Sequence, residues 1–209
     1  MQLILVAQQE ALAAAWEMYC GDLEFVTVHR GSILDLACDA VVSPANSFGF
    51  MNGGIDLLYS QTFGWGVQER LQRLIREYHF GELLVGSAEV IDTQHQSIPW
   101  LIAAPTMRMP MTVRDTINPY LAARAVFLCV LHGILRGGTQ AGRTVRDVVH
   151  TVAMPGLGTG VGGVEPAVCS RQVRAAIDQV LLRRDWYPEE WGQVLQQHEE
   201  FLGRPLPDA

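Results

Sequence analysis

The chain has 209 residues, of which 49% are hydrophobic and 18% are charged. This length and composition support one well-buried core and exclude an extensively disordered chain. The formal net charge of −7 argues against a broad electrostatic attraction to nucleic acid or to an anionic membrane. An anionic ligand would therefore have to be held by local hydrogen-bond donors.

The cysteines and the apolar segments indicate the compartment. Cys20, Cys38, Cys129 and Cys169 are widely spaced and form no Cys-x-x-Cys pair, so they are predicted to be free thiols in a reducing environment. The chain shows no basic region followed by an apolar run at its start, which predicts no signal peptide. The most apolar stretch, residues 120–135, is too short to span a bilayer. The sequence therefore predicts a cytoplasmic protein without a membrane partner.

The first part of the chain alternates between strand and helix. Residues 3–6 predict a strand, and the apolar spacing of residues 9–19 predicts an amphipathic helix that ends at Gly21. Residues 25–29 predict a second strand, and residues 33–37 a short connection. The strand and helix at the start are expected to be additions to the main fold.

The alternation continues to the end of the chain. Further strands are predicted at residues 40–42, 83–91, 100–104 and 146–154. Further helices are predicted at residues 67–78, 118–136 and 165–180 and in an aromatic extension from about residue 185, whose aromatic side chains are expected to cover the edge of the core. Asn118 and Pro119 favour the start of the second of these helices, and Gly137 its end. Together these elements predict one α/β domain over residues 1–209, a sandwich with a largely parallel or mixed sheet.

A polar, glycine-bearing loop follows the predicted strand at residues 40–42. Asn46 lies just past the carboxyl end of this strand, where open α/β sheets bind ligands. Gly53 and Gly54 allow a backbone to approach a bound group closely, and Asp56 adds a carboxylate. This loop is a candidate ligand site.

A second glycine-rich loop, residues 158–162, precedes the helix predicted from residue 165. Successive backbone N–H groups in such a loop can bind a diphosphate without a lysine. The spacing of Gly158, Gly160 and Gly163 also matches a dinucleotide fingerprint, but the loop follows a late strand and lacks an acidic residue at the usual distance. A tight connection without a ligand is the structural alternative.

Three stretches, in the same order, resemble the signature of the macrodomain family. In chain order they are the strand and turn at residues 26–33, Pro44-Ala45-Asn46-Ser47 with Gly53-Gly54-Ile55-Asp56, and the strand and glycine loop at residues 150–162. The resemblance extends over about residues 26–177. It implies an ADP-ribose site in a three-layer α/β/α macrodomain-like sandwich with a mixed central sheet.

The resemblance also implies roles for particular residues. Asn46 is expected to position the distal ribose and a water, and Asp56 to activate that water for hydrolysis of an ADP-ribosyl bond or an O-acetyl ester. Ser32 and Ile33 are expected to border the adenine. The expected diphosphate donors lie in the two glycine loops, at Gly53, Gly54, Ile55, Gly158, Thr159, Gly160, Val161 and Gly162. The structural alternatives are an asparagine that satisfies its own turn and an aspartate that caps a helix.

Two positions depart from the family pattern. Where this chain has Ser32, the family usually has an aspartate that accepts from the adenine amino group. Where it has Gly162, many members carry an aromatic residue that packs on the distal ribose, a place that Phe48 or Phe50 could fill.

Other polar residues receive structural interpretations. Gln68 and Glu69 resemble the Gln-Glu pair of poly(ADP-ribose) glycohydrolases only loosely, and a solvated ion pair between Glu69 and Arg73 is expected instead. The dispersed histidines predict neither a metal site nor a cofactor. ADP-ribose or an ADP-ribosylated substrate is the expected partner. A module that binds ADP-ribose without hydrolysis is the alternative, as is a pocket that holds another nucleotide or none.

Overall fold

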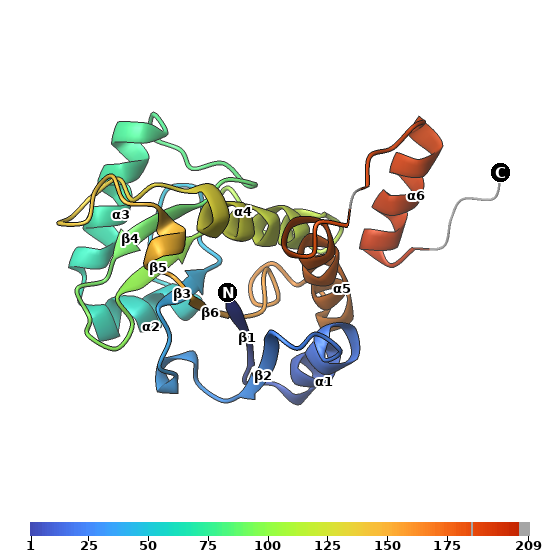
Figure 1. Cartoon of the computed structure of the whole chain (residues 1–209), viewed down its shortest axis with the longest axis horizontal. Helices are drawn as coiled ribbons and strands as arrows, with labels where there is room; N and C mark the ends of the chain where they lie inside the picture. Colours follow the sequence, from blue (N-terminus) through green and yellow to red (C-terminus); the bar gives the residue numbers. More distant parts are fainter. Residues whose placement is uncertain (185, 205–209) are drawn as a thin grey trace.

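A single mixed β-sheet organises the computed structural model, which describes residues 1–184 and 186–204 (Figure 1). Its strands are β1 (Gln2–Ala7), β2 (Val26–Arg30), β3 (Ala40–Ser43), β4 (Glu89–Asp92), β5 (Trp100–Ala103) and β6 (Thr151–Met154). Their order across the sheet is β2-β1-β6-β3-β5-β4. Only β4 runs antiparallel to its neighbour, so the other described strands all end at the same edge of the sheet.

Helices cover both faces of this sheet. They are α1 (Glu10–Cys20), α2 (Gly54–Phe63), α3 (Gly66–Tyr78), α4 (Asn118–His132) and α5 (Pro166–Ala176), while α6 (Trp191–Leu202) packs against α5. One group of buried apolar residues joins α1, α4 and α5 to one face, and a second joins α2 and α3 to the other. The predicted three-layer α/β fold is therefore confirmed. None of the helices in the described ranges is long and apolar enough to cross a bilayer.

The N-terminal strand and helix are an integral part of this fold, contrary to the expectation that they are additions. β1 lies between β2 and β6, where Leu3 is in register with Val26 on one side and Val152 on the other. Leu3 of β1 and Trp16 of α1 are both fully buried. The pairing of β1 with two strands depends on residues far apart in the chain, so local sequence patterns do not predict it.

Two strands are shorter than their apolar runs suggested. The run at residues 83–91 forms a strand only from Glu89, because Gly86 adopts a φ of 94° and turns the chain before it. The run at residues 146–154 forms a strand only from Thr151, because Val145–Asp147 makes a turn of 3-10 helix.

Helix α4 ends earlier than predicted, and Asn118 does not cap it. Asn118 is its first residue rather than its cap, and the Asn118 side chain donates to the Thr106 carbonyl at 2.8 Å. The helix stops at His132, before the predicted end at Gly137, and the Gly133 N–H donates to the Cys129 carbonyl. The Asn118 side chain therefore anchors the loop after β5 rather than the helix terminus.

Helix α6 lies at the periphery of the molecule, beyond α5 (Figure 1). Phe201 is its buried anchor, with its ring centroid 4.5 Å from that of Tyr120. The other aromatic side chains do not cover the core as expected, since Trp191 is 85% exposed and Tyr187 is 90% exposed. Helix α6 is thus attached near its own carboxyl end.

The cysteines behave as packing residues. All four are free, and Cys20, Cys38 and Cys169 are buried. Burial raises the pKa of the Cys20 and Cys169 thiols to about 12, which keeps them protonated and poorly nucleophilic.

Candidate functional site

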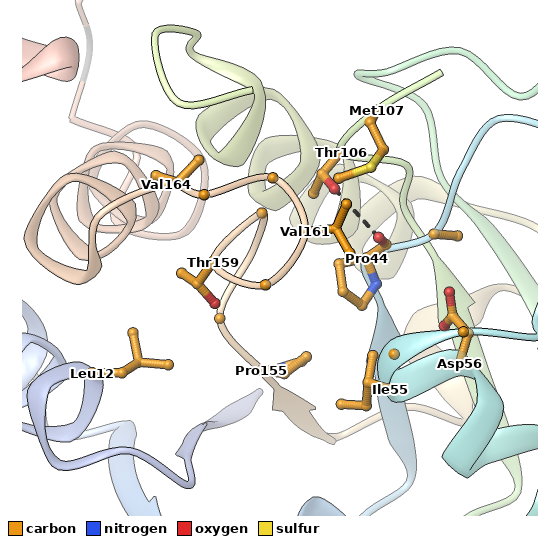
Figure 2. Close-up of a pocket in the computed structure, with 18 of the residues that line it drawn as sticks. Leu12, Pro44, Ile55, Asp56, Thr106, Met107, Pro155, Thr159, Val161 and Val164 are labelled. Carbon is orange, nitrogen blue, oxygen red and sulfur yellow. Dashed lines mark hydrogen bonds between the residues drawn. The ribbon is translucent and has the colours of Figure 1, made fainter. Parts of the chain in front are cut away.

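A cleft of about 710 Å³ lies where the parallel strands end. The segments that follow β1, β2, β3, β5 and β6 all contribute to its lining. Figure 2 shows Leu12 on one side and Asp56 on the other, with Thr159 and Val161 on a loop between them. The site thus occupies the position at which open α/β sheets bind ligands.

Nearly all of the residues predicted for a ligand site line this cleft. They are Ile33, Asn46, Gly53, Gly54, Ile55, Asp56, Gly158, Thr159, Gly160, Val161 and Gly162. Ser32 is the exception, because its side chain accepts from the Leu34 N–H at 3.3 Å and starts the 3-10 turn at Ile33. The two glycine loops, far apart in sequence, are therefore brought together.

The cradle loop, residues 158–163, uses one of its N–H groups internally, because the Gly163 N–H donates to the Gly160 carbonyl at 3.0 Å. Within the described residues, none accepts a hydrogen bond from the N–H groups of residues 159–162. The loop closes on itself instead through its ends, where the Val164 N–H donates to the Gly158 carbonyl at 3.0 Å. Gly158 adopts a φ of 69°, which strongly favours glycine. Such a run of free N–H groups suits an anion.

A neighbouring segment holds the carbonyl groups of the cradle loop. The Val113 N–H donates to the Gly162 carbonyl at 2.8 Å, and the Arg114 Nε donates to the Gly163 carbonyl at 3.1 Å. The Thr112 hydroxyl also donates to the Gly162 carbonyl. These bonds fix the loop in the conformation that leaves its N–H groups free.

The amino terminus of α2 lies on the opposite wall of the cleft. Gly53 is its N-cap and supplies no side-chain cap, so the first N–H groups of the helix are open to a ligand. The partial positive charge of a helix amino terminus also favours an anion. Asp56 lies in the first turn of α2 rather than at the cap.

Asp56 is the buried acid of the site, with 7% of its surface exposed. The Ser43 hydroxyl donates to its Oδ1 at 2.5 Å. Burial raises the pKa of Asp56 to about 6, and the bond from Ser43 partly opposes this shift. A carboxyl with this pKa exchanges protons close to neutral pH, as a general base requires.

Asn46 builds the loop that carries it. Its Oδ1 accepts from the N–H groups of Phe48 and Phe50 at 3.1 and 3.2 Å, and its Nδ2 donates to the Phe50 carbonyl at 2.8 Å. The structural alternative for this asparagine is thus observed. One amide hydrogen of Nδ2 stays available to a ligand, because an amide nitrogen carries two.

The structure also locates the phenylalanines of this loop and the Gln68-Glu69 pair. Phe50 lines the cleft, whereas Phe48 lies outside the lining and packs under Arg108. Gln68 accepts from the Met51 N–H at 2.7 Å and so supports the loop from behind. The expected Glu69 ion pair with Arg73 does not occur among the salt bridges of the described chain.

The sequence analysis missed several cleft residues. Arg114 is the basic residue among those that line the cleft, and it lies between β5 and α4. Gln8 and Gln9 line the cleft just after β1. The rule that ligands bind at strand ends could have identified the glutamines, since the strand before them was predicted.

Comparisons with known proteins give a consistent result. A family model described as a macro-like domain matches residues 35–208. Two relatives named only as uncharacterized proteins, from Aeropyrum pernix and Aquifex aeolicus, are each 30% identical. The matches cover 77% of this chain and 74% of the Aeropyrum protein, and 70% of this chain and 76% of the Aquifex protein.

Solved structures share the fold at lower identity. The macrodomain of Mycobacterium tuberculosis DarG is 20% identical, with a TM-score of 0.56 over 73% of this chain and 90% of its own. A glycine-to-valine mutant of the Oceanobacillus iheyensis macrodomain with ADPR is 17% identical, with a TM-score of 0.57 over 82% of this chain and 90% of its own. At these identities the likeness concerns the fold.

Proposed function

Because the chain belongs to the macro-like domain family, we propose that its cleft binds ADP-ribose and hydrolyses an ADP-ribosyl bond or O-acetyl-ADP-ribose. The observation that carries this proposal is the meeting of three features in one cleft. These are the free N–H groups of the cradle loop, the open amino terminus of α2 and the buried carboxyl of Asp56.

The diphosphate lies between the cradle loop and the start of α2. Backbone N–H groups from both walls donate to its oxygens, and the helix dipole adds to the attraction. This arrangement suits a chain of negative net charge, because it needs no excess of basic side chains.

The distal ribose lies beside Asn46 and Asp56. The free amide hydrogen of Asn46 donates to a ribose hydroxyl, and Asp56 removes a proton from a water. The water oxygen attacks the ester carbonyl or the anomeric carbon, the bond to the leaving oxygen breaks, and that oxygen takes up the proton. The hydrogen bond that the Ser43 hydroxyl donates to Asp56 keeps the carboxylate in place during this step.

Residue spacing in a solved macrodomain supports the assignment. Three structures of the Oceanobacillus iheyensis macrodomain carry a substitution of an asparagine, a glycine or an aspartate. That glycine lies seven residues after the asparagine, and the aspartate three residues after the glycine. Asn46, Gly53 and Asp56 have the same spacing, and structures of that macrodomain contain ADPR and ADP.

Binding without hydrolysis is the second candidate function. The Asn46 side chain favours this alternative, because it makes three hydrogen bonds within its own loop and has one N–H donor left for a ligand. Turnover of O-acetyl-ADP-ribose by the wild-type protein, lost in Asp56→Asn, separates hydrolysis from binding alone.

Calorimetric titration with ADP-ribose, with AMP and ADP as controls, tests the binding site. Gly160 offers a matched pair of variants, because a Cβ added there meets no atom within 4 Å. We expect Gly160→Ala to bind ADP-ribose as the wild type does. Gly160→Glu should abolish binding, because it places a negative charge where the diphosphate lies. Wild-type affinity in Gly160→Glu would contradict the proposed diphosphate position.

A further inference from the structure

The end of the cleft away from Asp56 has its own lining. Leu12 lies on this side (Figure 2), and Gln9 is joined to it because the Leu12 N–H donates to the Gln9 carbonyl at 3.1 Å. Gln8, Gly31 and Ile33 complete this end of the cleft. If the diphosphate occupies the cradle loop and the distal ribose lies beside Asp56, the nucleobase falls here, so the inference rests on the proposed function.

Ser32 is not placed to recognise a base. Its hydroxyl oxygen accepts from the Leu34 N–H, and the residue does not line the cleft. Ser32 therefore cannot accept from the adenine amino group, which is the function that the resemblance assigned to the aspartate usually found at this position.

Gln8 and Gln9 provide the polar groups at this end. Both side chains are exposed and line the cleft, and neither amide makes a hydrogen bond within residues 1–184 and 186–204. Gln9 is the N-cap residue of α1, yet its side chain makes no capping bond, so its amide is free. The apolar Leu12 and Ile33 side chains flank this position.

We propose that Gln8 and Gln9 bind the nucleobase of the ligand through their carboxamide groups. A carboxamide offers a donor and an acceptor together, which match the N6 amino group of adenine and its neighbouring ring nitrogen N1. Leu12 and Ile33 contact the ring faces. The glutamines thereby take over the task that the resemblance assigned to Ser32.

This mode of binding predicts an unusual tolerance. Replacing the adenine amino group by oxygen, as in hypoxanthine, exchanges donor and acceptor along the N1 edge of the ring, because N1 then carries a hydrogen. A half turn of the carboxamide restores the match, whereas a carboxylate can only accept. The hypoxanthine counterpart of ADP-ribose should therefore bind within about threefold of ADP-ribose, since the hydrogen bonds are exchanged rather than lost.

The test is calorimetric titration of the wild type and of the double variant Gln8→Leu/Gln9→Leu. Losing the paired hydrogen bonds should weaken ADP-ribose binding by about tenfold or more. Gln61→Leu is the matched control, because Gln61 is an exposed glutamine of α2 outside the cleft lining, and it should bind as the wild type does. Thermal unfolding should be unchanged in both variants, because the replaced side chains are exposed.

Three outcomes would overturn the inference. If the double variant binds ADP-ribose with the same affinity as the wild type, the glutamines have no role in binding, and the proposed diphosphate and ribose positions are unaffected. A preference of about a hundredfold or more for adenine over hypoxanthine would refute the exchangeable amide contact. Failure of the wild type to bind ADP-ribose at all would remove the proposed function itself, and the inference with it.

Discussion

Asp56 is held where its ionised form is disfavoured. Burial raises its folded-state pKa from 3.8 to about 6, although the Ser43 hydroxyl donates to it. A group whose pKa is raised on folding contributes stability at low pH and loses it as the pH increases. For Asp56 this loss takes place between about pH 4 and pH 6.

Asp56→Asn should therefore make the protein more stable at pH 8, by up to about 3 kcal/mol, while hydrolysis is lost. The amide keeps the shape of the side chain and can still accept from Ser43. Denaturant unfolding at pH 8 and at pH 4 measures the effect, which should disappear at pH 4. A variant that is less stable than the wild type at pH 8 would show that the ionised carboxylate is stabilised by the fold.

Ser43 should set the pH at which the site becomes active. If Asp56 is the base, hydrolysis of O-acetyl-ADP-ribose should increase with pH and reach half of its maximum near pH 6. Ser43→Ala removes the hydrogen bond that lowers the pKa of Asp56, so the curve should move to higher pH. The measurement is kcat/KM as a function of pH, and an unmoved curve in Ser43→Ala would exclude this contact as a determinant.

The cradle loop depends on the absence of a side chain at Gly162. A Cβ added there would lie 2.5 Å from the Gly158 carbonyl oxygen and 2.7 Å from a methyl group of Val113. We expect Gly162→Ala to distort the loop, to weaken ADP-ribose binding by tenfold or more and to lower stability by about 2 kcal/mol. Gly160→Ala, measured by the same titration and thermal unfolding, is the control. Equal behaviour of the two variants would show that the loop accommodates the added methyl group.

Helix α6 should depend on a single aromatic contact. Phe201 is 6% exposed and packs against Tyr120, and its carbonyl accepts from Gln172 at 3.1 Å. Phe201→Ala should lower the free energy of unfolding by about 3 kcal/mol. Trp191→Ala in the same helix should change it by less than about 0.5 kcal/mol, because Trp191 is 85% exposed. Denaturant unfolding of both variants measures the difference, and a large loss in Trp191→Ala would mean that the exposed face of α6 has a partner.

Helices whose buried faces follow a regular spacing of apolar residues could be predicted from the sequence. A helix was predicted at residues 165–180, and Cys169, Val173 and Val180 in that range are all buried, because helical periodicity places them on one side. The location of β1 within the sheet and the start of α2 at Gly54 were not predicted, since strand pairing and the closure of a loop depend on distant residues.

The same distinction applies to the site. Motif order was enough to bring Asn46, Asp56 and the cradle loop into one set of candidates. Side-chain direction was not predictable in this way. Whether Ser32 faces the cleft depends on one bond to Leu34, and whether Asn46 is free depends on its own loop. Such bonds leave no periodic trace in the sequence.

At the scale of the whole molecule, the cleft joins segments that follow strands on both sides of β6. A ligand that contacts them all can bind only the folded protein and must raise its stability. At a free ADP-ribose concentration of about 100 times Kd, the gain should be about 2.7 kcal/mol, which corresponds to an increase in Tm of roughly 5–10 °C. Thermal unfolding with increasing ADP-ribose measures it. Gly160→Glu should show no shift, and a ligand-dependent shift in that variant would place the ligand elsewhere.

The basic residues of the chain are all arginines, 15 in number, and Arg114 is the one that lines the cleft. Under the proposed function, the diphosphate is bound mainly by peptide groups. A peptide N–H is present in every residue except proline, so substitutions that preserve the backbone conformation leave these donors in place. Substitutions around the cleft can thus change side-chain chemistry while the backbone donors stay in place, and the residues on which these donors depend are those that fix the conformation of the cradle loop, such as Gly158 and Gly162.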